Sequence, residues 1–297
     1  MHRNLVAIAV IVCLAPRTMP ARGADETTQL KEVRVAEAVD GDTVRVWWNK
    51  EKVELVRYLA VNAPEMDEPF GQDAHRQNEQ LVAGKTCWLE LQPASDDYRR
   101  DSRKRLLAYL WQDKSSTQCV NIEMVRQGAA RIDVRDVRDD TPADDFAVKH
   151  LGALLAAQLD ACRARRGWWA KGDSHADSDL AIVFIKFWGK DETLYLVNRS
   201  QQPVNLCDGW QLADRGSKHK LAFASAFPTG ECLLPAGGVC RVHTNQFGKL
   251  PPPASGQKEI DIGWSKRGVW NNGGDEATLT DKNGRVVYRY TYKGHGG

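Results

Sequence analysis

Three short clusters in the first half of the chain combine acids, an amide and arginines in a pattern that suits phosphate chemistry. They are Asp40-Gly41-Asp42-Thr43, then Arg57 followed by Asn62-Ala63-Pro64-Glu65, and finally the run 101–108, which holds Arg103, Lys104 and Arg105. Each cluster alone has an ordinary explanation, as a turn, a capped loop or a solvated charged face. Their joint occurrence is what suggests a site.

Together the clusters supply the groups that hydrolysis of an anionic diester needs. Carboxylate and amide oxygens, with a backbone carbonyl, are hard ligands that suit Ca²⁺ rather than Zn²⁺. A nearby carboxylate can hold or deprotonate an attacking water. Two guanidinium groups can donate paired hydrogen bonds to phosphate oxygens and offset the charge that develops in the transition state. The sequence therefore predicts a metal-assisted phosphodiester site.

The elements around these clusters read as strands first and helices afterwards. Runs rich in β-branched residues, separated by Gly and Asp turn signals, predict the strands. Apolar residues at helical spacing, each run ending near a glycine or a basic stretch, predict the helices. We expect strands over 33–38, 43–48, 53–61, 86–91 and 105–111, and helices over 71–83, 121–127 and 143–166.

The chain changes character from about residue 180 onward. Short strands separated by Gly- and Pro-bearing turns indicate a β-sandwich. The expected strands cover 181–188, 193–198, 209–213, 239–243, 277–280 and 286–292. The polar stretch 172–178 is interpreted as the linker between the two halves.

The first half resembles the staphylococcal-nuclease-like (thermonuclease) domain. The resemblance rests on five ordered blocks: the two clusters around Asp42 and Glu65, Phe70-Gly71-Gln72-Asp73-Ala74, the run 101–108, and Met124-Val125-Arg126-Gln127-Gly128. It implies a fold that is mainly β with α, a five-stranded OB-fold barrel plus three helices. It also implies Ca²⁺-dependent cleavage of DNA and RNA that leaves 3′-phosphate ends.

The resemblance also implies a role for each matching residue. Asp42 matches the metal carboxylate, and Asp40 the neighbouring acid that shapes the site from the second shell. Glu65 matches the general base or water-orienting residue. Arg57 and Arg105 match the two arginines that contact phosphate.

Several positions depart from the family pattern. Asn62 stands where the family usually has a metal-binding Asp, so an oxygen is kept and a charge is lost. Ala63 would bind metal only through its backbone carbonyl. We therefore expect weaker Ca²⁺ binding, or a shift towards Mg²⁺ or Mn²⁺. Arg103 and Lys104 replace the usual Tyr-Gly and are expected to bind the substrate backbone. Val134 and Asp136 replace the tyrosines of the base pocket.

The second half resembles the lamin-tail domain, an immunoglobulin-like β-sandwich. The resemblance rests on the segments 203–212, 234–237 and 270–275 and on Tyr290-Thr291-Tyr292. It implies a binding or spacing module that contributes no catalytic residues.

Composition limits the class of protein. The chain has 297 residues, of which 42% are hydrophobic and 27% charged, the balance of a soluble globular protein of about two domains. The formal charge is only +2, so binding to a polyanion cannot rest on bulk charge.

The N-terminus predicts an exported protein. The apolar stretch 5–14 is shorter than the roughly 20 residues of a membrane-spanning helix. With its basic start and small residues at 21–24, it is typical of a signal peptide over residues 1–23. We therefore expect a secreted, periplasmic or cell-surface protein without a membrane span. The remaining cysteines are even in number and predict disulfides, whose pairing the sequence leaves open; Cys232 and Cys240 flank a segment that suits a hairpin, and the alternative is that two thiols stay free. The six cysteines are Cys87, Cys119, Cys162, Cys207, Cys232 and Cys240.

The leading hypothesis is an exported, Ca²⁺-dependent endonuclease with little sequence preference, acting on DNA and RNA as a monomer. Its nuclease domain would cover 24–171, the linker 172–178 and the sandwich 179–293. One alternative is a catalytically weak or inactive module that binds nucleic acid. The other is a surface adhesion protein that acts through the tail domain, whose partner the sequence does not identify.

Overall fold

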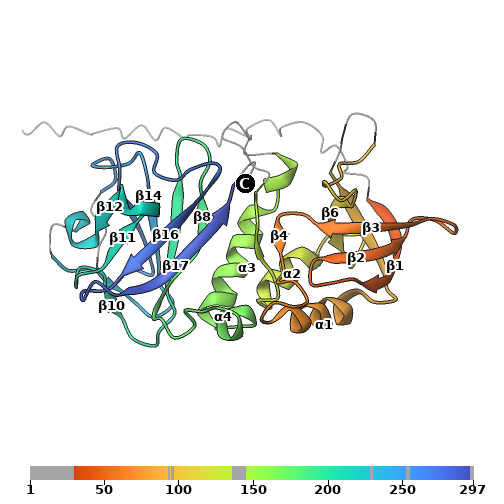
Figure 1. The fold of residues 1–297 in the computed structure, drawn as a ribbon, viewed down its shortest axis with the longest axis horizontal. Helices are drawn as coiled ribbons and strands as arrows, with labels where there is room; N and C mark the ends of the chain where they lie inside the picture. The colour runs from red at the N-terminus through yellow and green to blue at the C-terminus, as the bar shows by residue number, and fades with distance from the viewer. Residues whose placement is uncertain are drawn as a thin grey trace, which may run out of the picture.

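The computed structural model describes residues 30–92, 94, 97–135, 145–227, 230–251 and 255–294. A β-barrel with its helices makes up one half of the molecule and a β-rich half follows, with helix α3 (Leu151–Arg163) running between them (Figure 1). The expected signal peptide lies outside the described residues. No helix in the described ranges is long and apolar enough to cross a membrane.

A closed five-stranded barrel forms the first half, as the resemblance implies. Its strands run in the order β1-β2-β3-β6-β5. Side chains alternate between the two faces of a strand, so Val44, Val46 and Val56 point into the barrel core and are fully buried. The five strands are β1 (Lys31–Ala38), β2 (Thr43–Trp47), β3 (Val53–Tyr58), β5 (Thr86–Leu91) and β6 (Leu106–Trp111).

The strand expected over 53–61 is broken in two, which corrects the sequence prediction. Strand β3 ends at Tyr58, and a turn with Ala60 at φ 61° leads into β4 (Val61–Asn62). The Arg57 guanidinium stabilises this turn, because it donates to the carbonyls of both Tyr58 and Val61 at 2.6 Å. Strand β4 then pairs with β7 (Arg131–Ile132), outside the barrel.

Three helices accompany the barrel: α1 (Gly71–Val82), α2 (Val120–Arg126) and α3. The single helix expected over 143–166 is wrong in extent. Residues 143 and 144 lie outside the described ranges, and a 3₁₀ turn, η1 (Phe146–Val148), precedes α3. Between them, Lys149 and His150 bind the buried Glu90 carboxylate at 2.7 and 2.9 Å, which holds the chain against the barrel before the helix begins. A short helix, α4 (Trp168–Lys171), follows α3.

Two four-stranded sheets form the core of the second half, so the expected β-sandwich class is confirmed. One sheet has the order β15-β14-β9-β8 and the other β12-β11-β16-β17. A small sheet pairs β10 (Val204–Asn205) with β13 (Leu233–Leu234). The strands of the first sheet are β8 (Leu180–Lys186), β9 (Thr193–Asn198), β14 (Val239–His243) and β15 (Glu259–Gly263). Those of the second are β11 (Gln211–Ala213), β12 (Lys220–Ala222), β16 (Gly274–Thr280) and β17 (Val286–Lys293), with 3₁₀ turns η2 (Arg215–Ser217) and η3 (Phe223–Ala226) beside them.

The cysteine predictions are not supported. All six described cysteines are free thiols, and five of them are buried. Cys232 and Cys240 do not face each other across a hairpin, because β13 pairs with β10 whereas β14 pairs with β9 and β15. Burial raises the pKa of the Cys162 and Cys232 thiols to about 12, which leaves them as small apolar side chains rather than nucleophiles.

Buried polar contacts join the two halves. Gln158 of α3 accepts a hydrogen bond from the Ile132 backbone in β7 and donates one to the Val183 carbonyl in β8, both at 2.7 Å. In the segment interpreted as a linker, Asp173 forms a buried ion pair with Arg199 at 2.9 Å and accepts a hydrogen bond from the Tyr288 hydroxyl. These contacts fix the sandwich against α3 and the strand next to β4.

Candidate active site

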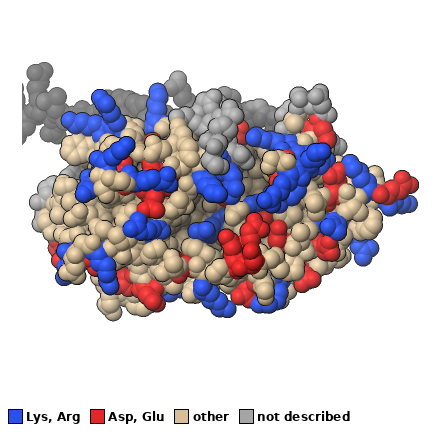
Figure 2. All heavy atoms as spheres, in the orientation of Figure 1, with Lys and Arg blue, Asp and Glu red and all other residues tan. Residues whose placement is uncertain are grey.

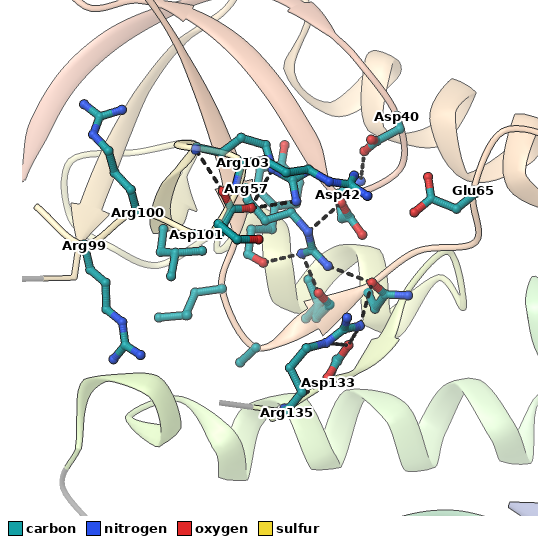
Figure 3. Close-up of a pocket in the computed structure, with 18 residues that line it drawn as sticks. Asp40, Asp42, Arg57, Glu65, Arg99, Arg100, Asp101, Arg103, Asp133 and Arg135 are labelled. Carbon is teal, nitrogen blue, oxygen red and sulfur yellow. Dashed lines mark hydrogen bonds and ion pairs between the residues drawn. The ribbon is translucent and has the colours of Figure 1, made fainter. Parts of the chain in front are cut away.

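A cavity of about 410 Å³ opens at one rim of the barrel (Figure 3). It lies where the 40–42 turn, the 59–62 turn, the 99–105 loop and residues 133–135 meet. The structure brings seven of the residues singled out from the sequence to its walls: Asp40, Asp42, Arg57, Asn62, Glu65, Arg103 and Arg105. Ala63 and Lys104 do not line it.

The turn between β1 and β2 is held by close packing and by α1. A side chain at Gly41 would approach the Cβ atoms of Ala63 and Ala74 to 2.5 and 2.8 Å, so only glycine fits there. The buried Asn78 of α1 donates to the Asp40 carbonyl at 2.7 Å. The Asp40 carboxylate in turn accepts the Asp42 backbone N–H at 2.8 Å, which sets the two acids side by side.

Asp42 is buried, and its carboxylate is enclosed by donors. It accepts the Ala63 N–H at 2.7 Å and the Thr43 hydroxyl at 3.1 Å, and it pairs with the Arg57 Nε at 3.0 Å. Burial raises the pKa of Asp42 to about 6; Arg57 opposes this rise and the Asp40 charge adds to it. Arg57 therefore compensates only part of the negative charge at the 40–42 turn.

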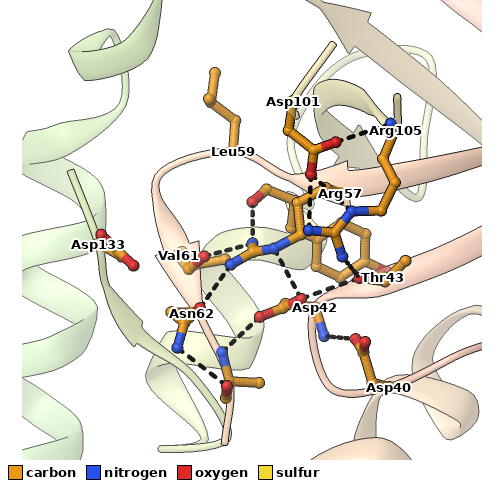
Figure 4. Close-up of polar contacts among 12 residues, drawn as sticks. Asp40, Asp42, Thr43, Arg57, Leu59, Val61, Asn62, Asp101, Arg105 and Asp133 are labelled. Atoms are coloured by element: carbon orange, nitrogen blue, oxygen red, sulfur yellow. Dashed lines mark hydrogen bonds and ion pairs between the residues drawn. The ribbon is translucent and has the colours of Figure 1, made fainter. Parts of the chain in front are cut away.

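Arg57 ties the Asp42 carboxylate to the Asn62 amide (Figure 4). Its Nη2 donates to the Asn62 Oδ1 at 2.8 Å, and its Nη1 donates to the two turn carbonyls described above. A guanidinium has five N–H donors. Four are engaged, so one is left without a partner in the described chain to meet a phosphate.

Arg105 reaches the same cavity from the loop before β6. Asp101 accepts its Nε at 2.7 Å and pairs with its Nη2 at 2.7 Å, and Thr43 accepts its Nη1 at 3.0 Å. Asp101 also accepts the backbone N–H groups of Arg103 and Arg105, so one carboxylate shapes the turn and aims the guanidinium. Two N–H donors of Arg105 have no partner in the described ranges.

Glu65 lies across the cavity from these arginines (Figure 3). Its backbone is fixed, because its N–H donates to the Glu68 carboxylate at 2.9 Å and its carbonyl accepts the Glu68 N–H at 2.9 Å. Its own carboxylate makes no hydrogen bond or ion pair within the part of the chain that the structure describes. An exposed, uncommitted carboxylate at a cavity wall can hold or deprotonate a water.

Four further charged residues line the cavity: Arg99, Arg100, Asp133 and Arg135. Figure 2 shows Lys and Arg side chains gathered over the barrel half beside a group of acids. Arg135 contacts both Asp133 and the Asn62 Oδ1, so a residue 73 positions away in sequence adds to the charge around Asn62. The basic run around Arg99 was visible in the sequence, but the approach of the 133–135 segment depends on the β4–β7 pairing, which no local motif signals.

Two positions at which the family has the tyrosines of its base pocket differ in this chain. Val134 is buried and Asp136 lies outside the described ranges. Lys104 adopts a left-handed backbone with φ 64°, which explains why glycine suits this position in the family motif. Its carbonyl accepts a hydrogen bond from Arg100 at 2.9 Å.

The donor set at the rim fits a hard divalent cation. Asp40 and Asp42 supply carboxylates, Asn62 an amide oxygen and Ala63 a carbonyl that now accepts the Asn62 Nδ2 at 3.2 Å. The incompletely compensated charge of the two acids is what a cation would balance. No group of three or more His, Cys, Asp or Glu side chains in the described ranges could hold a metal. Binding would thus need the amide and the backbone.

Comparisons with known proteins match both halves of the chain to known families. Residues 55–171 match the family model described as staphylococcal nuclease homologue, and residues 173–294 match that described as lamin tail domain. Similar curated proteins include the SPbeta prophage-derived endonuclease YokF and the endonuclease YncB of Bacillus subtilis (strain 168), each 36% identical over 110 residues, or 35% of this chain. An uncharacterized endonuclease of Escherichia coli O157:H7 is 28% identical over 140 residues, 47% of this chain and 78% of that protein. The matched region spans only 35% of YokF and 49% of YncB.

Proposed function

Because this chain joins a staphylococcal nuclease homologue domain to a lamin tail domain, we propose that it is an endonuclease that hydrolyses phosphodiester bonds in DNA and RNA. One observation carries the proposal. Arg57 and Arg105 present unpartnered N–H donors to the same cavity that Glu65 lines with an uncommitted carboxylate. An anionic diester bound there would meet two cations and a base.

The proposed reaction divides the work among these three residues. Arg105 and the remaining donor of Arg57 bind the non-bridging phosphate oxygens and stabilise the extra charge on phosphorus as water adds. Glu65 orients that water and accepts its proton. The bond from phosphorus to the 5′-oxygen breaks, and this oxygen takes up a proton from solvent, so the products are a 3′-phosphate and a 5′-hydroxyl end. Asp101 keeps the Arg105 guanidinium aimed at the phosphate through its contacts at 2.7 Å.

We further propose that the enzyme uses a divalent cation, Ca²⁺ first, with Mg²⁺ or Mn²⁺ as alternatives. Asp42, the Asn62 amide and the Ala63 carbonyl would hold it, and Asp40, which accepts the Asp42 N–H, would shape the site behind them. The bound cation would supply positive charge close to the scissile phosphate. Arg57 already contacts Asp42 and Asn62, so its guanidinium and the cation share the same two oxygens, which favours weak binding.

Export is part of the proposal and rests on the apolar stretch 5–14. The competing function is a module that binds nucleic acid without cleaving it. The engagement of Arg57 with four protein acceptors favours that alternative. The lone carboxylate of Glu65 opposes it.

Turnover of labelled oligonucleotides across Ca²⁺, Mg²⁺, Mn²⁺ and EDTA tests the proposal, with analysis of the product ends. We expect cleavage that EDTA abolishes and that leaves 3′-phosphates. Glu65→Gln and Arg105→Ala should each remove it, whereas Asp67→Asn, an exposed acid two residues from Glu65 that does not line the cavity, should not. Binding without turnover under every metal would leave the non-catalytic module as the function.

A further inference from the structure

On the outer face of the barrel, side chains of β2 and β3 lie opposite each other in pairs that lead away from the cavity, and each pair is here called a row. In order from the cavity, the rows are Thr43 with Arg57, Arg45 with Leu55, and Trp47 with Val53. Alternate residues of these strands, Val44, Val46 and Val56, are buried in the core, so the rows point outward.

The first row belongs to the candidate active site, because Arg57 lines the cavity and Thr43 contacts Arg105 at 3.0 Å. Trp47 lies four residues further along β2, about 14 Å away at the rise of an antiparallel strand. Strand β1 extends the outer rows, with Glu37 opposite Arg45 and Arg34 opposite Trp47. The face is therefore continuous from the cavity to Trp47.

Trp47 is a large aromatic residue that is exposed on this face instead of being packed in the core. Its side chain is 45% exposed, and it lines a hollow of about 840 Å³. The neighbouring Trp48 differs, because its ring meets Tyr98 edge-on and the Lys31 ammonium at 5.1 Å. The Trp47 ring has no aromatic or cationic partner within the described ranges.

Two cations and one acid, Glu32, lie around the hollow that holds this ring. Arg34 and Lys50 line the same hollow, and neither forms an ion pair within the described part of the chain. Arg45, one row closer to the cavity, pairs with Glu37 at 2.9 Å, and both of these side chains are about half exposed. Exposed pairs of this kind contribute little, so a phosphate can displace Glu37 from Arg45 at small cost.

We propose that Arg34, Arg45, Trp47, Lys50 and Val53, here called the Trp47 strip, bind a stretch of single-stranded nucleic acid that continues into the cavity. A base would stack on Trp47 and Val53, and the phosphates on either side would contact the three cations. The inference rests on the proposed function, since it extends the same substrate beyond the scissile linkage.

Single-stranded substrate is favoured because a ring that lies on an open β-face can stack only on a base that is free of its own neighbours. The strip also supplies what the cavity lacks. Val134 is an aliphatic side chain and is buried, so it cannot stack on a base beside the scissile phosphate. Contact with the substrate base is thereby moved about 14 Å along β2.

Binding measured without turnover tests the strip. The full-length chain in EDTA is titrated into a labelled single-stranded oligonucleotide of about ten nucleotides, within the range one OB fold covers, and into the matching duplex, with anisotropy as the readout. Trp47→Ala should weaken single-strand binding about tenfold and change duplex binding far less. Trp47→Phe should restore most of the affinity. Phe247→Ala, at a 55% exposed site in the other half, is the matched control.

Cleavage separates this inference from the proposed function. Trp47→Ala should raise KM for the longer oligonucleotide and leave the cleavage of a dinucleotide unchanged. If Trp47→Ala binds and cleaves like the unmodified chain while Arg105→Ala is inactive, the strip is refuted and the nuclease stands. If the unmodified chain does not cleave but Trp47→Ala still loses single-strand affinity, the Trp47 strip is supported and the proposed nuclease activity is not. An equal loss for single strand and duplex would also overturn it, as would failure of Trp47→Phe to rescue a folded Trp47→Ala protein.

Discussion

Asp101 binds both the backbone and the side chain of Arg105: it accepts the backbone N–H at 2.9 Å and contacts the guanidinium Nε and Nη2, each at 2.7 Å. The carboxylate therefore fixes both where the residue sits and where its side chain points. Asp101→Asn keeps an oxygen that can accept the backbone N–H groups of the turn, but it loses the negative charge that holds the Arg105 guanidinium. Because misplacement of a group by about 1 Å can cost about 10²-fold in rate, we expect kcat to fall by about that factor with KM little changed. Steady-state kinetics of Asp101→Asn beside Asp97→Asn, an acid of the same loop, measure this. A fall in both variants would assign the effect to loop charge.

Arg57 and Arg105 should separate into a structural and a purely catalytic arginine. Arg57 holds the buried Asp42 and the turn that ends β3, so Arg57→Ala should cost about 3 kcal/mol of unfolding free energy, as for a broken buried pair. In Arg105→Ala the Asp101 carboxylate keeps the backbone N–H groups of residues 103 and 105 as donors, so this variant should cost less, about 1 kcal/mol. Denaturant unfolding compares the two, and both variants should lack turnover. Equal stability losses would contradict the distinction.

Restoring a carboxylate at position 62 should strengthen cation binding. Asn62→Asp adds a third acid to a rim that already holds Asp40 and Asp42, and affinity for Ca²⁺ follows the number of charged ligands. We expect an increase of at least about tenfold, measured by calorimetric titration of the intact chain. Asp133→Asn, which changes an acid of the same cavity outside the donor set, serves as the control. If Asn62→Asp binds Ca²⁺ no more tightly than the unmodified chain, the cation does not bind at position 62.

Acid should destabilise the protein partly through Glu90. Burial opposes ionisation of Glu90, but hydrogen bonds from His150 and Lys149 outweigh it and lower the pKa of the carboxyl to about 2 from its usual 4.5. A depressed pKa in the folded state means that the stabilisation is complete above pH 4.5 and is lost as the pH falls from 4.5 towards 2. In urea unfolding over this range, Glu90→Gln should be less stable at neutral pH and show a smaller decline. An unchanged decline would exclude Glu90 as a contributor.

The buried pair between Asp173 and Arg199 should couple the two halves. Arg199→Met leaves a buried carboxylate unpaired and should cost about 3–5 kcal/mol. If the halves unfold together, a single thermal transition will shift as a whole in both calorimetry and tryptophan fluorescence. The double variant Asp173→Leu with Arg199→Met should recover part of the loss, since it removes both charges. Two separate transitions in the unmodified chain would contradict the coupling.

Sequence patterns predicted most of the strands and helices, because alternation and turn residues are local signals. The closed barrel was implied by the resemblance to a known family and not by these patterns. They failed where a distant side chain decides the local backbone. The break after Tyr58 is stabilised by the Arg57 guanidinium, and the late start of α3 follows from Glu90, 60 residues away from His150. The site residues with motif character were predictable, whereas Asp101 as an aiming group and the 133–135 segment depend on contacts formed only in the fold. The even cysteine count misled, because all six described cysteines are unpaired and five of them are buried.

The Gln158 side-chain oxygen accepts a hydrogen bond from the β7 backbone, and its nitrogen donates one to the β8 backbone. Separation of the two halves would therefore leave a buried peptide group without its hydrogen-bond partner. The tail is thus not an interchangeable cassette. Recombination that grafts it onto another nuclease would have to carry the matching surface of α3 with it, and the inheritance of the two parts should be linked accordingly.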